Sequence, residues 1–165
     1  IQSPMAKVIL GGLLSATFLN GFVVPVIYLL IMICKIKMIP SSISETFYLG
    51  GGYWFTVVMF IVSFLIAAGM LDLTEGSNWQ FLSFLTASGL AFVGAAPHFH
   101  DSEKVIHYVG AAFMLIGSQI WISIFSSPLI LLTWVLSIFW IRNKNRVFWA
   151  EITCIFNLMF SLFFI

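Results

Sequence analysis

Long apolar runs separated by short polar segments dominate the hydrophobic pattern of this sequence. Roughly 20 mainly apolar residues are needed to cross about 30 Å of hydrocarbon as a helix. Six runs reach or approach that length, and they fall at about 8–34, 53–73, 79–96, 105–125, 128–141 and 147–165. The pattern predicts an all-α fold, a polytopic membrane protein built as a single six-transmembrane-helix bundle.

Glycine, proline and interfacial aromatic residues mark the expected ends of these runs. Pro40 follows the first run, and three glycines at 50–52 precede the second. Tyr53 and Trp54 at the start of the second run suit the membrane–water interface. Pro128 suits the first turn of the fifth helix, because proline lacks the N–H that such a turn leaves unpaired.

The composition supports a membrane location. The 165 residues are 61% hydrophobic and 8% charged, whereas about 25% of the residues of a soluble domain are charged. A surface with so few charges cannot face water all round. The two cysteines, Cys34 and Cys154, would lie at different depths of the bundle, so we expect no disulfide between them.

Basic residues predict the orientation. With six spans, one side of the membrane receives six of the seven basic residues: Lys35, Lys37, Lys104, Arg142, Lys144 and Arg146. The other side receives Lys7. Cytoplasmic loops carry the excess of Lys and Arg, so we expect both termini on the non-cytoplasmic side, in the cell membrane if the protein is prokaryotic.

A ridge of small residues runs along the third span. Ser83, Ala87, Ala91 and Ala95 recur every four residues, a spacing that lets helix backbones approach closely in a membrane. The ridge predicts that the third span is central to the bundle. Packing within one molecule and contact with a second copy are both compatible with it.

The polar stretch 97–107 holds all three histidines of the chain, His98, His100 and His107, together with Asp101 and Glu103. Imidazoles and carboxylates form a suitable ligand set for zinc or another divalent metal. The predicted ligands are the three histidines with Glu103, although their spacing matches no strict metal signature. A solvated interfacial loop and a site for a polar ligand or lipid headgroup are the alternatives.

Other polar residues lie within the apolar runs. Glu151 sits near the start of the sixth run, and a carboxylate at membrane depth is costly enough to suggest a function. It could instead reach the interface or pair with a nearby basic residue. Asn20, Gln119 and Asn157 are expected to form hydrogen bonds between helices.

Two segments carry a resemblance to a known group. The run from Ser88 to Pro97, then a short polar loop, then the segment from Ile106 to Phe113 resembles the middle of certain uncharacterised prokaryotic six-span membrane proteins related to the DRAM/Frag-like superfamily. There, too, a span ends near a proline and a short loop leads to a His-x-x-Gly-Ala helix start, so His107 and Gly110 correspond. The resemblance implies a six-helix bundle. His98 and His100 depart from its pattern, so it does not imply metal binding.

Three classes of function follow. The first is a non-enzymatic membrane protein, either an assembly subunit or a binder of lipid or a small ligand, whose partners are membrane lipid, other subunits or itself. The second is a metal-dependent membrane enzyme such as a lipid hydrolase, with Asp101 or Glu103 as the base beside the histidine ligands. The third is a small transporter or channel that uses Glu151, Gln119 and Asn157. No motif points to nucleic acid.

Overall fold

The computed structural model describes residues 12, 23–96, 104–135, 137 and 144–164, and every regular element in this part of the chain is helical. The elements are α2 (Val24–Ile36), the π-helix η2 (Phe47–Gly51), α3 (Tyr53–Leu73), α4 (Phe81–Ala95), α5 (Lys104–Phe125), the 3-10 helix η5 (Pro128–Leu132) and α7 (Arg146–Phe164). The all-α prediction is confirmed for the described residues.

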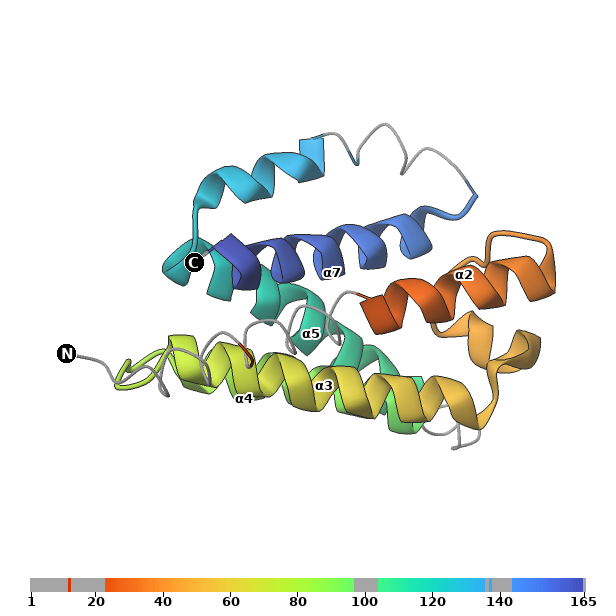
Figure 1. The fold of residues 1–165 in the computed structure, drawn as a ribbon, viewed down its shortest axis with the longest axis horizontal. Helices are drawn as coiled ribbons and strands as arrows, with labels where there is room; N and C mark the ends of the chain where they lie inside the picture. The colour runs from red at the N-terminus through yellow and green to blue at the C-terminus, as the bar shows by residue number, and fades with distance from the viewer. Residues whose placement is uncertain (1–11, 13–22, 97–103, 136, 138–143, 165) are drawn as a thin grey trace.

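Helix α4 lies at the centre of the packing, as its small-residue ridge predicts. It contacts α3 on one side and α5 on the other, and α5 in turn contacts α7 (Figure 1). Two ridge residues face α3: the Ser63 hydroxyl donates to the Ala87 carbonyl at 2.7 Å, and the Thr74 and Ser83 hydroxyls are 3.2 Å apart. Ala91 and Ala95 are half-buried.

The closest approach of two helices lies on a neighbouring face of α4. A Cβ added to Gly89 would come within 2.5 Å of the Gly110 carbonyl oxygen on α5, and one added to Gly110 would meet the Gly89 oxygen at 2.8 Å. Neither glycine has room for a side chain. The Gly89–Gly110 contact therefore sets the distance between α4 and α5.

Two of the described helices, α3 and α5, are long and apolar enough to cross a bilayer, whereas the sequence predicts six such spans. The difference has local causes. The described part of the first run is α2, with 13 residues, and α4 has 15. Helix α4 ends at Ala95, and Ala96 keeps helical backbone angles directly before Pro97. The fifth run begins as the short η5, and much of it lies outside the described residues.

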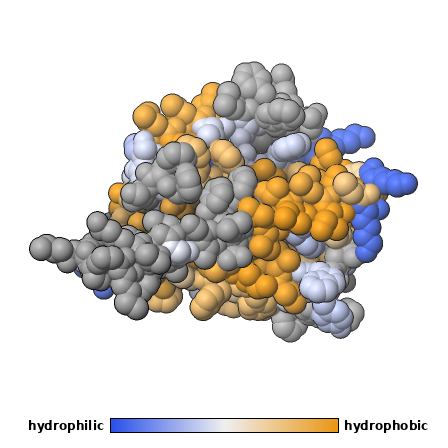
Figure 2. All heavy atoms as spheres, in the orientation of Figure 1, coloured by the Kyte–Doolittle hydropathy of each residue, from blue (hydrophilic) through white to orange (hydrophobic). Residues whose placement is uncertain are grey.

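The molecule combines an apolar core with an apolar exterior. Large side chains such as Phe55, Ile66, Trp121 and Leu158 are fully buried, yet Leu30, Phe64 and Ile116 are more than half exposed. Figure 2 shows apolar residues over much of the visible face, with the most hydrophilic coloured residues gathered near the end where α2 stops and α7 starts. Contiguous exposed apolar surface marks a contact with membrane or with another protein.

Candidate functional site

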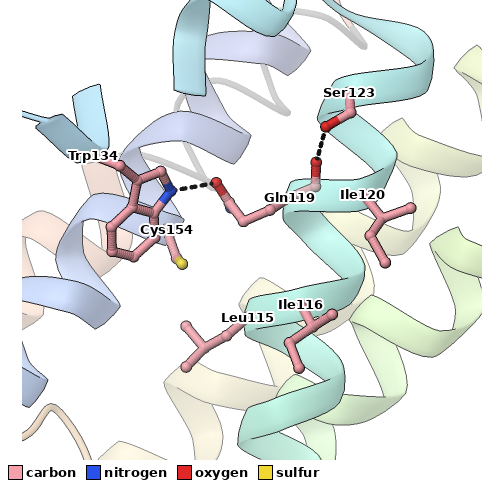
Figure 3. Close-up of a pocket in the computed structure, with 7 residues that line it drawn as sticks. All are labelled: Leu115, Ile116, Gln119, Ile120, Ser123, Trp134 and Cys154. Carbon is pink, nitrogen blue, oxygen red and sulfur yellow. Dashed lines mark hydrogen bonds between the residues drawn. The ribbon is translucent and has the colours of Figure 1, made fainter. Parts of the chain in front are cut away.

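A cavity of about 390 Å³ opens beside α5, in the range typical of small-molecule sites. We call it the α5 groove, and its lining residues are Leu115, Ile116, Gln119, Ile120, Ser123, Trp134 and Cys154 (Figure 3). Its walls are mostly apolar. Ile116 and Ile120 are also exposed on the outside of α5, so the groove opens towards the surroundings of the bundle.

The polar wall of the α5 groove is a hydrogen-bond network centred on Gln119. Its Oε1 accepts from the Trp134 indole N–H at 2.9 Å and from the Asn157 amide at 3.3 Å. Its Nε2 donates to the Ser118 hydroxyl at 3.0 Å. That bond uses one of the two donor hydrogens that a glutamine amide carries.

The same network ties the fifth run to α7. The Thr133 hydroxyl donates to Asn157 Oδ1 at 2.7 Å, and the Ser137 and Thr153 hydroxyls are 2.8 Å apart. Asn157 is fully buried. The predicted interhelical hydrogen bonding of Gln119 and Asn157 is confirmed, while Asn20 lies outside the described residues. A buried polar network with its partners satisfied holds one arrangement of side chains.

Glu151 belongs to a different set of contacts, at the other end of α7. Its carboxylate accepts the backbone N–H of Ile43 at 2.6 Å. The sequence suggests that Glu151 could pair with a nearby basic residue, but the partner in the structure is this backbone amide in the connection between α2 and α3. Glu151 thus fixes a loop and does not line the α5 groove.

Two further bonds hold the same loop against the start of α7. The Asn145 amide donates to the Ile39 carbonyl at 3.0 Å, and the Phe148 N–H donates to the Ser41 carbonyl at 3.0 Å. On its inner side, the buried Thr46 hydroxyl lies 2.9 Å from the Tyr28 hydroxyl. We call residues 39–46 the docked loop, since their backbone bonds to residues at the start of α7 and the Thr46 hydroxyl contacts Tyr28 on α2.

Of the predicted metal ligands, His107 is the one within the described residues, and His98, His100 and Glu103 lie outside them. Asp101, a candidate base, also lies outside them. The half-buried His107 side chain lies near the backbone of Val93 on α4 and packs edge-on against the Tyr108 ring. The residues that the structure describes contain no group of three His, Cys, Asp or Glu side chains able to hold a metal ion. The metal centre therefore stays a prediction.

Sequence reasoning identified Gln119 and Asn157 but not Trp134, Thr133 or the groove itself. A tryptophan in an apolar run gives no signal of its own, because most such residues are lipid-facing or core. The usable signal was the presence of three hydroxyl residues, Ser123, Thr133 and Ser137, among apolar residues of this part of the sequence. Their short polar side chains mark helix faces that can form hydrogen bonds. Both cysteines are free, as expected, with Cys34 exposed and Cys154 buried.

Comparisons with protein-family models, with curated proteins and with solved structures found no match to this chain.

Proposed function

We propose that this protein is a non-enzymatic integral membrane protein that holds a hydrocarbon chain of a lipid in the α5 groove. The observation that carries the proposal is the groove itself, with its apolar walls and a single polar wall at Gln119. Small-molecule sites are typically mainly apolar, with a few placed polar groups that fix the orientation of the ligand.

The surroundings of the groove support a lipid as the ligand. Helix α5 is one of the two described helices that can cross a bilayer, and the groove opens past Ile116 and Ile120 on its exposed side. In a membrane, hydrocarbon chains are the molecules that meet such an opening. The remaining N–H of Gln119 suits an ester or carboxyl oxygen near the chain.

In this proposal the shorter helices α2, α4 and α7 accompany α3 and α5 through the membrane, and the fifth run completes the six spans. Both termini lie on the non-cytoplasmic side, as the distribution of basic residues predicts. The buried network around Asn157 stabilises contacts between helices. Assembly with other subunits or a second copy remains part of the proposal.

A photoreactive fatty acid tests the groove directly. The purified protein in detergent is irradiated with a fatty acid that carries a diazirine in its chain, and the labelled peptides are identified by mass spectrometry. We expect labelling on the peptides that contain Leu115–Ser123 and Cys154. Ile120→Trp should reduce this labelling several-fold, because the indole fills the groove.

Val109→Trp is the matched control. Val109 and Ile120 lie on the same helix and are both 43% exposed, but Val109 does not line the groove. Labelling spread evenly over all exposed helices, or equal labelling in the two variants, would refute a groove that selects hydrocarbon.

A further inference from the structure

Two segments that are far apart in the sequence meet at one end of the molecule. The Asn145 side-chain amide donates a hydrogen bond to the Ile39 carbonyl at 3.0 Å, and the Phe148 N–H donates to the Ser41 carbonyl at the same distance. These bonds join the end of α2 to the start of α7 across more than a hundred residues. The sequence neighbours of Ile39 and Asn145 are therefore brought close together in space.

The flanking residues are basic. Lys35 and Lys37 precede Ile39, while Lys144 and Arg146 stand on either side of Asn145, and all four are exposed. We call these four residues the basic patch. The most hydrophilic residues of the visible face gather in the same region (Figure 2). The docked loop thus brings together four positive charges from two segments that are far apart in the sequence.

Two nearby carboxylates form hydrogen bonds to the backbone of the docked loop. Glu45 accepts the Ser41 N–H, and Glu151 accepts the Ile43 N–H. Glu45 lies in the docked loop and Glu151 on α7, and each carboxylate accepts a backbone N–H of the docked loop. The far end of α3 carries the opposite charge, with Asp72 and Glu75 exposed.

Exposed apolar and aromatic side chains lie close to the basic patch in the sequence. Met38 is 57% exposed and Ile39 is 44% exposed, between the two pairs of bases. Tyr48 and Trp54, which follow the docked loop, are also largely exposed. Aromatic residues of this kind are enriched where headgroups meet hydrocarbon, so the partner of the patch should combine an anionic group with an apolar layer.

From this arrangement we infer that the basic patch binds the phosphate headgroups of anionic phospholipids in the leaflet next to it. Clusters of Lys and Arg immediately beside membrane helices attract anionic lipids, with about 1 kcal/mol of attraction for each basic residue near the surface. The inference rests on the proposed membrane location, and it is separate from the α5 groove, which lies further along α5 and α7.

Native mass spectrometry of the protein in detergent tests the inference. The number of bound molecules is compared for phosphatidylglycerol and phosphatidylcholine with identical acyl chains. We expect tighter binding of phosphatidylglycerol at low salt. The preference should fall about fivefold for each charge removed in Lys37→Gln, Lys144→Gln and Arg146→Gln, and it should shrink at high salt, which screens exposed charges.

Two controls separate charge from position. Lys104→Gln removes a positive charge from the first residue of α5, outside the patch, and should leave most of the preference intact. Asn145→Ala keeps all four charges but removes the bond to Ile39, so it should weaken the preference by separating the two pairs of bases.

Equal binding of the two lipids, or a triple variant that keeps the parent's preference, would overturn the inference. Displacement of the lipid by inorganic phosphate at constant ionic strength would assign the patch to a free anion and overturn it as well. A separate measurement would reveal failure of the membrane location itself. In that case, alkaline carbonate would extract the parent protein from membranes.

Discussion

At the scale of single residues, Glu151 shows what sequence can and cannot predict. A carboxylate in an apolar run is costly to bury, so Glu151 is expected to have a partner. Its partner is the Ile43 backbone N–H, 108 positions away. Every non-proline residue carries such a donor, so composition and spacing do not single out Ile43. Gln119 and Asn157 were predictable for the opposite reason, because polar side chains are rare in these runs.

Removing the Glu151 carboxylate should loosen the docked loop. Leaving a buried hydrogen-bond donor without its partner costs about 1–3 kcal/mol, so we expect Glu151→Ala, which removes the acceptor of the buried Ile43 N–H, to lower the free energy of unfolding by about that amount. Thermal unfolding in detergent measures the change, and hydrogen exchange should rise at the Ile43 amide. Glu151→Gln, which keeps an acceptor oxygen, should cost less.

Glu75→Ala provides the comparison, because Glu75 is exposed in the turn after α3. It should leave both the unfolding temperature and the exchange of Ile43 unchanged. If Glu151→Ala behaves in the same way, the carboxylate does not hold the loop.

At the scale of elements, the glycine, proline and aromatic residues at the ends of the apolar runs determined how well the helices could be predicted. The second run was expected at 53–73, which are the bounds of α3, and α5 begins one residue before the expected 105. Gly52, with a φ of 48° that suits glycine, separates η2 from α3. The Gly89–Gly110 contact was not predicted, because the regular four-residue ridge of α4 directs attention to the face that packs on α3.

A side chain at Gly89 should separate α4 from α5. In Gly89→Ala the new Cβ would lie within 2.5 Å of the Gly110 carbonyl oxygen and 2.6 Å of the Met114 nitrogen. Since both neighbours are backbone atoms, one helix must move, and overpacking of this kind costs about 1–3 kcal/mol.

Thermal unfolding in detergent again provides the measurement for this variant. Gly12→Ala is the control, since an added Cβ there would meet nothing within 4 Å. Equal stability of the Gly89→Ala protein and the parent would show that α4 and α5 do not approach as closely as described.

At the scale of the whole molecule, the proposed location in a bilayer rests on the apolar exterior, the groove and the charged end. The all-α class followed directly from the long apolar runs. The groove did not, because it depends on how α5, α7 and the residue Trp134 come together, and hydrophobic periodicity carries no information about that packing. The histidine stretch lies mainly outside the described residues, so its metal hypothesis stays a prediction.

The most direct test of the central claim is fluorescence quenching by phospholipids brominated in the middle of the acyl chain. Proteins that keep one of the six tryptophans are reconstituted in such lipids, with the others replaced by phenylalanine. Trp134 lines the α5 groove, whereas Trp121 is fully buried. The proposal predicts strong quenching of Trp134 and little quenching of Trp121. Trp134 fluorescence that brominated lipid leaves unchanged, but aqueous iodide quenches, would contradict a lipid-filled groove in the membrane.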